Sequence, residues 1–408
     1  MTDTNENRIE DIQDENNHSS VFERNEDTGS AADLDAAMEA AIAQAQGERP
    51  AIVLPDYVAD TYFDSGKWDD QQKAFQANRP VNTGYPWMDA EQPLYPGLYV
   101  LGAISSLGKT TFLHQMGDQI AADGTPVLYF SFEQTAHELY AKSLSRRIRN
   151  EKYSNPSYHP YTAIEIRNGI ADGTKELSEQ IDAYKTAVGN RMHIIECDLY
   201  TTVEDILSAI SSFMEETKTK PVVIVDYLQI ISPTEVNGRI DTDQRFNIDH
   251  IVKALKQFQK EYGIVLIAIC SLNRANYTTP VDMESFKESG CIEYTADVVW
   301  GLNLALIFDK DFETKSVGKG GTKDTTVTDK RLMVMKAKEA PIRDIVLKAV
   351  KNRYGRASYT VYFEYEAAYD LFTKGSPLDY AVHKNQLQAE VEEDQKRVNA
   401  AMSSDDKE

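Results

Sequence analysis

Short apolar runs alternate with longer amphipathic stretches through the middle of the chain. From about residue 97, the apolar runs predict strands and the stretches between them predict helices. The run at 222–225 is apolar at every position, which is typical of a strand that is covered on both faces. We therefore predict an α/β domain with a mainly parallel central sheet. The predicted strands are 97–103, 126–132, 192–197, 221–231 and 264–270, and the predicted helices are 109–123, 135–149, 174–188, 203–217 and 244–262.

The pattern changes after residue 296, where strand-like runs follow one another with short connections. Short connections predict antiparallel strands, here added to one edge of the sheet. Within this region, residues 313–325 are rich in Gly, Lys and Thr, which is typical of a loop. Ahead of the domain, residues 50–96 mix Pro, Tyr, Trp and Asp around one predicted helix near 67–78. The strand-like runs are 296–308, 331–339, 344–353 and 358–366.

Composition places a packed domain between two polar ends. Hydrophobic residues make up 41% of the 408 residues and charged residues 26%, which excludes a wholly disordered chain. Residues 1–49 contain 13 acidic and 3 basic residues, and residues 390–408 contain 7 and 3. Segments of this kind cannot bury enough apolar area to offset the entropy of ordering. We divide the chain into a disordered acidic tail at 1–49, a linker at 50–96, a folded domain at 97–372 and an acidic, partly helical or disordered tail at 373–408.

The net charge of −22 argues against a broad basic surface for nucleic acid, although the two tails hold most of the imbalance. The three cysteines have no CxxC spacing, so neither a disulfide framework nor a cysteine zinc site is predicted. The first thirty residues lack the pattern of a signal peptide, and no apolar run is long enough to span a bilayer. We predict a cytoplasmic protein without a membrane partner.

The stretch AISSLGKT at 103–110 lies between a predicted strand and a predicted helix. A turn at such a junction directs backbone N–H groups and a helix N-terminus at phosphate, which predicts a nucleotide site for ATP. In this pattern Lys109 reaches the outer phosphates, and the Thr110 hydroxyl binds Mg²⁺. The alternative is a chance GKT at a helix start. The predicted nucleotide-binding residues are Ala103, Ser105, Ser106, Leu107, Gly108, Lys109, Thr110 and Thr111.

Two carboxylates follow predicted strands of the same sheet. Asp226 ends the run VVIVD, where a carboxylate can hold Mg²⁺ through water. Glu133 follows the strand after the phosphate loop, where it could orient and deprotonate water for attack on a γ-phosphate. Each has a plainer interpretation: many buried strands end in Asp, and an acid at a helix N-terminus is stabilised by the helix dipole.

Six segments in order resemble the RecA-type motor domain of DnaB-type replicative helicases, over roughly residues 81–372. The resemblance implies a RecA-like P-loop fold with antiparallel C-terminal strands. It also implies a hexameric ring that uses ATP and Mg²⁺, moves on single-stranded DNA and unwinds duplex DNA. It leaves open whether a primase or a loader serves the ring. The segments are 103–110, SFEQ at 131–134, VDYLQII at 225–231, LNR at 272–274, ESGCIEYTADVV at 288–299 and KNRYG at 351–355.

The resemblance also implies roles for individual residues. Glu133 and Lys109 become catalytic, and Arg353 matches an arginine finger that reaches the nucleotide of the neighbouring subunit, with Lys351 beside it. Taken without the family, KNR between two strands is only a basic turn. The ESG block resembles a DNA-contacting loop, although it too could be only a turn. Its candidate residues for contacts to the DNA backbone are Lys287, Glu288 and Gly290.

The chain departs from the family pattern at three places. Ser271 replaces the Gln that senses the γ-phosphate, and Lys142 replaces an Arg on the helix after Glu133. Residues 1–96 do not resemble the N-terminal collar domain of the family, and the approach to the phosphate loop looks like helicase-like ATPases of phages and mobile elements. These departures keep a second function open, a nucleotide-switched loader or assembly ATPase without unwinding. A filament-forming RecA-like recombinase is a third option, which fits the ESG and KNR segments less well.

The linker offers a further prediction about assembly. Residues 50–80 carry apolar side chains in a mostly polar setting, and these could pack on the adjacent subunit as a docking arm. An independent surface flap explains the same pattern equally well. The apolar residues concerned are Val53, Tyr57, Phe63 and Phe75.

Overall fold

A computed structural model describes the chain over residues 59–64, 66–77, 79–236, 239–240, 244–272, 278–286, 290–309 and 325–405. It divides into two compact units, Met1–Lys73 and Ala74–Glu408, which are considered separately. The acidic tail at 1–49 and almost all of the predicted loop at 313–325 lie outside the described residues.

The first unit includes helix α2 (Ala59–Asp64) and most of α3 (Lys67–Ala77), the helix expected near 67–78. The ring of Phe63 packs against those of Tyr62 and Trp68, each at a centroid distance of 5.6 Å. The hydroxyl of Tyr62 donates a hydrogen bond to Gln71 Oε1 at 2.6 Å, so the two helices are joined to each other. The role of this segment as a docking arm stays a prediction.

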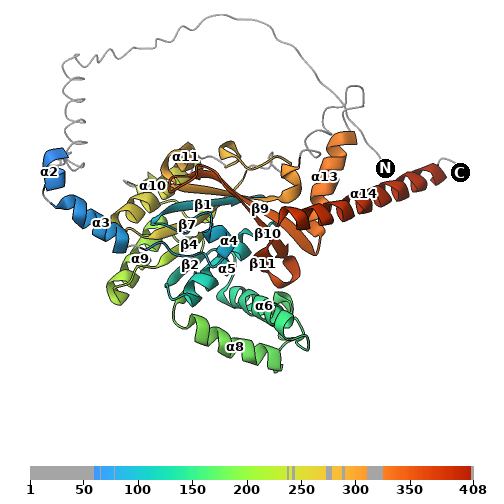
Figure 1. Cartoon of the computed structure of the whole chain (residues 1–408), viewed down its shortest axis with the longest axis horizontal. Helices are drawn as coiled ribbons and strands as arrows, with labels where there is room; N and C mark the ends of the chain where they lie inside the picture. The colour runs from blue at the N-terminus through green and yellow to red at the C-terminus, as the bar shows by residue number, and fades with distance from the viewer. Residues whose placement is uncertain are drawn as a thin grey trace, which may run out of the picture. The chain divides into compact units, whose positions relative to one another are not determined.

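The second unit is built on a nine-stranded sheet, which confirms the predicted α/β class (Figure 1). Six neighbouring strands are parallel, and three antiparallel strands extend one edge. In spatial order they are β11 (Leu371–Lys374), β10 (Thr360–Glu366), β9 (Ile342–Asn352), β8 (Val298–Leu304), β1 (Gly97–Ala103), β7 (Val265–Ser271), β4 (Val222–Asp226), β2 (Val127–Ser131) and β3 (Met192–Glu196). A separate hairpin pairs β5 (Glu235–Val236) with β6 (Arg239–Ile240).

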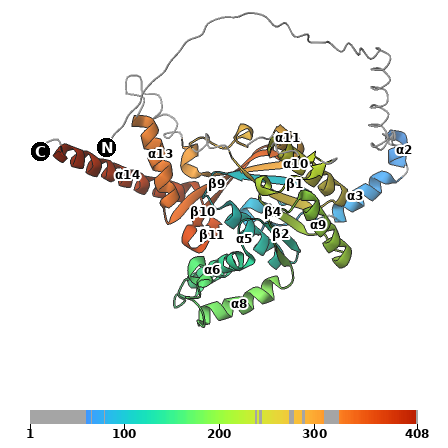
Figure 2. The same cartoon turned by 180° about the vertical axis from the view of Figure 1, so that it is seen from behind.

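Every residue of β1 and β4 is buried, as their continuous apolar runs predict. One face of the sheet packs against α5 (Lys109–Ala122), α6 (Ala136–Ser154) and α8 (Lys175–Val188). The other face packs against α9 (Val203–Thr217), α10 (Gln244–Tyr262) and α11 (Gly290–Thr295); α9 and α10 lie side by side in Figure 2. The remaining helices are α4 (Pro86–Asp89), α7 (Ala163–Arg167), α13 (Thr325–Glu339) and α14 (Pro377–Asp405), and the short 3₁₀ turns are η1 (Leu228–Ile230), η3 (Met283–Ser285), η4 (Ala305–Phe308) and η5 (Ala367–Tyr369).

Three sequence predictions about these elements are wrong. The run at 331–339 belongs to helix α13, because Val334 and Ala337 are buried at helical spacing in contact with α14 and β9. The run at 221–231 is a strand only as far as Asp226 and then turns into η1. The strand at 298–304 is parallel to β1 rather than antiparallel, because it enters the sheet beside the start of β1, where the Asp297 N–H donates to the Leu98 carbonyl at 2.8 Å.

Two further sequence predictions concern the membrane and the cysteines. Among the described residues, no helix is long and apolar enough to cross a bilayer. All three cysteines are free thiols.

Candidate active site

The phosphate loop is the turn between β1 and α5. Its backbone is left-handed at Ser106 (φ 67°) and at Gly108 (φ 82°). The positive φ at Gly108 favours glycine, and a Cβ there would make a tight contact of 3.0 Å with the Tyr365 ring. The Lys109 ammonium donates to the Ala103 carbonyl at 3.0 Å, which folds the lysine back into the loop. Burial lowers the pKa of Lys109, and the nearby carboxylates of Asp226 and Glu133 oppose that shift.

The loop opens on a cavity of about 500 Å³, the size range of small-ligand sites. The structure brings most of the predicted nucleotide residues together there with Glu133, Asp226 and Ser271. Leu107 is an exception, because its side chain is fully buried in the core. Ala103 contributes through its carbonyl, described above. The lining is Ser105, Ser106, Gly108, Lys109, Thr110, Thr111, Glu133, Gln134, Lys142, Asp226, Tyr227, Ile269, Ser271, Arg343, Tyr365 and Ala367.

The two predicted carboxylates lie at the ends of adjacent strands: Asp226 is the last residue of β4, and Glu133 follows the end of β2, where Ser131 pairs opposite Asp226. Asp226 is buried and accepts hydrogen bonds from the hydroxyl of Tyr129 at 2.8 Å and from that of Thr110. Burial raises the pKa of Asp226, and these two hydrogen bonds oppose the shift. Glu133 lies at the cavity and is hydrogen-bonded to Tyr227.

Gln229, a residue not predicted from the sequence, holds the end of β7. Ser271 lies opposite Ala103 in the sheet, so the predicted sensor position adjoins the start of the phosphate loop. Its N–H donates to Gln229 Oε1 at 3.1 Å, and Gln229 Nε2 donates to Cys270 Sγ at 3.0 Å. Gln229 lies in the VDYLQII segment, and the turn of the chain after Asp226 brings it under β7.

A second missed residue is Arg343, which reaches the cavity from β9. Its guanidinium donates to the Ser106 carbonyl at 2.9 Å and lies over the ring of Tyr365, its partner on β10, at 5.5 Å. Its Nε is buried and has no hydrogen-bond partner among the described residues. A half-buried guanidinium that lines this cavity beside the phosphate loop suits an anionic ligand.

Lys142 supplies a further cation at the same cavity. Its ammonium donates to Thr111 Oγ1 at 3.1 Å and forms an ion pair with Asp370, also at 3.1 Å. The Thr111 hydroxyl in turn donates to Asp370 at 2.8 Å. Lys142 is therefore tied to the first turn of α5, next to the residues of the phosphate loop.

The structure does not bring Arg353 and Lys351 to the cavity of their own chain. Arg353 forms an ion pair with the buried Asp297 at 3.1 Å, where β8 begins, and also donates to the Tyr294 carbonyl. Lys351 donates to the Glu293 carbonyl. Arg353 follows the far end of β9, ten residues after Arg343 at the cavity end, which is at most about 33 Å of extended chain. The Arg353 side chain is half exposed, at the end of β9 that lies away from the cavity.

The predicted DNA-contacting residues are only partly described. Lys287 and Glu288 lie outside the described residues. Gly290 is the exposed first residue of α11, and a Cβ built on it would meet nothing within 4 Å. Their role stays a prediction.

A comparison with protein families identifies the family of the chain that forms this cavity. The model of the DnaB-like helicase C terminal domain matches residues 81–357, about two thirds of the chain. The chain belongs to this family. Membership confirms the resemblance on which the sequence prediction rests. The DnaB-like match includes the phosphate loop, both carboxylates and Arg353.

Curated relatives of this DnaB-like chain are replicative DNA helicases. The DnaB protein of Buchnera aphidicola (subsp. Baizongia pistaciae) is 25% identical over 248 residues, which cover 59% of this chain and 50% of the relative. The DnaB protein of Helicobacter pylori (strain 26695) is 23% identical over 332 residues, 78% and 64% of the two chains. The chain therefore spans between half and two thirds of the length of these relatives.

Solved structures agree on the fold of the DnaB-like domain. One of them, described as an ATPase domain, aligns with a TM-score of 0.58 at 18% identity, covering 79% of this chain and all of that chain. A DnaB-like replicative helicase, solved to describe its interactions with primase, aligns with a TM-score of 0.57, also at 18% identity, covering 84% and 72%.

Proposed function

We propose that this protein is an ATP-dependent DNA helicase, which couples ATP hydrolysis to movement on single-stranded DNA and to duplex unwinding during replication. The observation that carries the proposal is the meeting of Lys109, Thr110, Glu133 and Asp226 at one cavity in a DnaB-like chain. Both relatives are replicative DNA helicases, which favours unwinding over a loader or assembly function.

The residues around the cavity would have different tasks in ATP hydrolysis. Lys109 and the first N–H groups of α5 would neutralise the phosphates, and Glu133 would orient and deprotonate the attacking water. The oxygen atoms of Thr110 and Asp226 fit a hard cation such as Mg²⁺, with Asp226 binding through water. The ion would supply positive charge to the phosphates when bound.

Arg353 would act on the nucleotide of the next subunit, since the cavity of its own chain lies at the other end of β9. A guanidinium supplied by a neighbour stabilises negative charge in the transition state, and it makes hydrolysis depend on assembly. This supports a homo-oligomer, which we propose to be a hexameric ring. A ring would also collect six copies of Lys287, Glu288 and Gly290 around one strand of DNA, which an acidic lone subunit would bind only weakly.

The helicase proposal makes a direct prediction. With ATP and Mg²⁺, the full chain should separate a forked DNA duplex, and single-stranded DNA should stimulate its ATPase. Strand separation is measured by gel or by fluorescence, with a blunt duplex without single-stranded arms as the control. ATPase activity without strand separation, together with a stable protein partner, would favour the loader function instead.

Arg343 should matter for nucleotide binding. Arg343→Ala removes the hydrogen bond to the phosphate loop and the unpaired Nε donor. It should therefore lower kcat/KM for ATP by about tenfold or more, the range for a charged hydrogen bond. Arg343→Lys keeps the charge without the planar stacking on Tyr365, so it should recover only part of the loss. Steady-state ATPase kinetics measure the effect. Arg356→Ala, an exposed arginine paired with Glu91, is the matched control. Unchanged kcat/KM in Arg343→Ala would contradict this role.

A further inference from the structure

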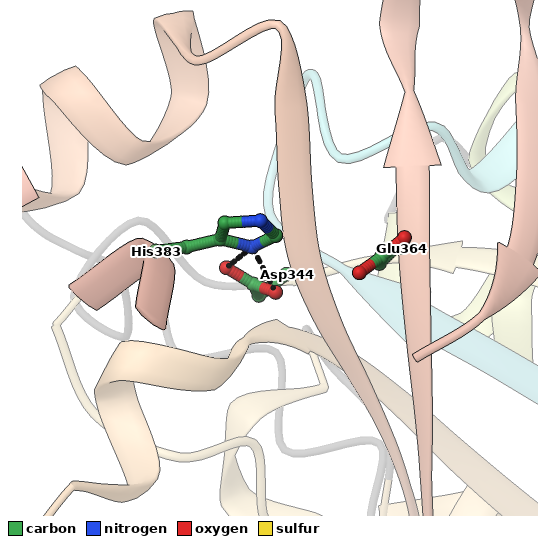
Figure 3. A group of neighbouring side chains, drawn as sticks. All are labelled: Asp344, Glu364 and His383. Atoms are coloured by element: carbon green, nitrogen blue, oxygen red, sulfur yellow. Dashed lines mark hydrogen bonds and ion pairs between the residues drawn. The ribbon is translucent and has the colours of Figure 1, made fainter. Parts of the chain in front are cut away.

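Three side chains of metal-binding types meet outside the active site, on the β9–β10 hairpin and α14 (Figure 3). Asp344 on β9 lies directly opposite Glu364 on β10, so both carboxylates project from the same face of the sheet. His383 on α14 extends its imidazole to Asp344. Each ligand thus comes from a different element.

The separations of these atoms suit a common ion. His383 Nδ1 lies 3.0 and 3.1 Å from the two carboxylate oxygens of Asp344, and one ligand atom from each of the three residues lies within 4.8 Å of the others. Two ligands that are each about 2.1 Å from a tetrahedral metal ion are about 3.4 Å apart. Small side-chain rotations would therefore place all three atoms around one ion.

The local charge also favours a cation. The Asp344 and Glu364 carboxylates are neighbours at this site, and the Asp379 carboxylate adds further negative charge beside them. In the described part of the chain, the Glu364 carboxylate accepts no hydrogen bond, and the nearby Lys384 ammonium forms an ion pair with Asp309 at 2.6 Å.

We propose that Asp344, Glu364 and His383 bind one divalent transition-metal ion, which fastens α14 to the β9–β10 hairpin. Imidazole together with carboxylates favours an ion such as Zn²⁺ over Mg²⁺ or Ca²⁺, which prefer oxygen ligands alone. The side chains of Asp344 and His383 are 15% and 30% exposed, so the site is half-buried and open on one side. Three protein ligands and an open side leave room for water to complete the coordination.

The proposed metal site and the nucleotide cavity use the same stretch of the β9–β10 hairpin, on opposite faces of the sheet. Arg343 and Asp344 are consecutive on β9, so their side chains point to opposite faces, as do those of their partners Tyr365 and Glu364 on β10. A metal bound to Asp344 and Glu364 would hold the same stretch of hairpin that presents Arg343 to the phosphate loop.

Metal binding to the full chain tests the proposal. Protein freed of metal by chelation, without nucleotide, should bind one Zn²⁺ per chain by titration calorimetry, and Co²⁺ should give visible absorption bands that Zn²⁺ removes. Glu364→Gln and His383→Gln should each weaken the affinity by about tenfold or more. Because the Glu364 carboxylate accepts no hydrogen bond among the described residues, Glu364→Gln should leave the metal-free fold intact, which thermal unfolding verifies.

The matched control is His250→Gln. His250 also meets a carboxylate, Glu204 at 2.9 Å, but no third ligand joins that pair in the described residues, so this variant should bind Zn²⁺ like the wild type. Zn²⁺ should also slow proteolysis within α14. The proposal is overturned if the wild type binds no stoichiometric Zn²⁺, if Glu364→Gln and His383→Gln bind as tightly as the wild type, or if equimolar Mg²⁺ displaces the ion. Unchanged cleavage of α14 would overturn the fastening role.

Discussion

A Lys109→Ala variant is expected to lose ATP hydrolysis by about 100- to 1000-fold while keeping its fold. The ammonium is the cation of the phosphate loop itself, and removing one donor aimed at developing negative charge typically costs about 3 to 4 kcal/mol of transition-state stabilisation. Among the described residues, the Lys109 ammonium donates hydrogen bonds only to the carbonyls of Ala103 and Ile104 at the start of the loop. Its removal should therefore disturb packing little.

The measurement is ATP turnover with single-stranded DNA, accompanied by strand separation, which should disappear with hydrolysis. Lys185→Ala, on the surface of α8 beside Asp182, provides a matched lysine control that should behave like the wild type. Thermal unfolding of both variants checks that the domain remains folded. A Lys109→Ala protein that hydrolyses ATP and unwinds DNA at the wild-type rate would refute the assignment of the nucleotide site.

Mixing two inactive variants should restore hydrolysis if Arg353 acts on the neighbouring subunit. Arg353→Ala should lower turnover by about 10³-fold or more, the effect of removing an arginine finger, and Glu133→Gln should also abolish it. In a mixed ring, the cavity of an Arg353→Ala subunit keeps Glu133 and can receive Arg353 from a Glu133→Gln neighbour. Random mixing at equal amounts should create about one such interface in four.

The experiment requires proof that the rings are mixed, for instance by co-purification through a tag on only one variant. Because Arg353 also pairs with Asp297, Arg353→Lys should be compared to separate lost charge from lost packing. Arg356→Ala, three residues away, should retain activity on its own. Verified mixed rings with no recovered hydrolysis would contradict action between subunits, as would full activity of Arg353→Ala alone.

The helices and strands that could be predicted from the sequence are those whose hydrophobic pattern does not depend on distant parts of the chain. β1 and β4 are covered on both faces, so each is a continuous apolar run that predicts a strand without any knowledge of its neighbours. Helix α13 has its apolar residues clustered at 332–335, a pattern that predicts a strand, while the positions that decide its structure are Val334 and Ala337, buried against distant elements. The direction of β8 is hidden for a similar reason, since it depends on where the chain enters the sheet beside β1.

The active-site residues likewise divide into those with a local sequence signal and those placed by distant parts of the chain. Lys109 and Thr110 are visible in the sequence as part of a phosphate-loop motif, and Glu133 and Asp226 are visible because each stands at the end of an apolar run or just after it. Arg343 is invisible, because it reaches Ser106 across 237 positions of sequence through the pairing of distant strands. Gln229 carries a weak local signal as a polar residue within an otherwise apolar run, but only the fold shows that it holds the end of β7.

Strand β9 carries Arg343 near one end and leads into Arg353 at the other. If Arg353 serves the next subunit, this single strand is a spacer between two consecutive nucleotides of the ring, the one bound by its own chain and the one bound by its neighbour. Inserting one residue in its middle would lengthen the spacer by about 3.3 Å and turn every side chain on one side of the insertion to the opposite face. The spacing of the nucleotides around the ring would then depend on strand length as well as on the contacts between subunits.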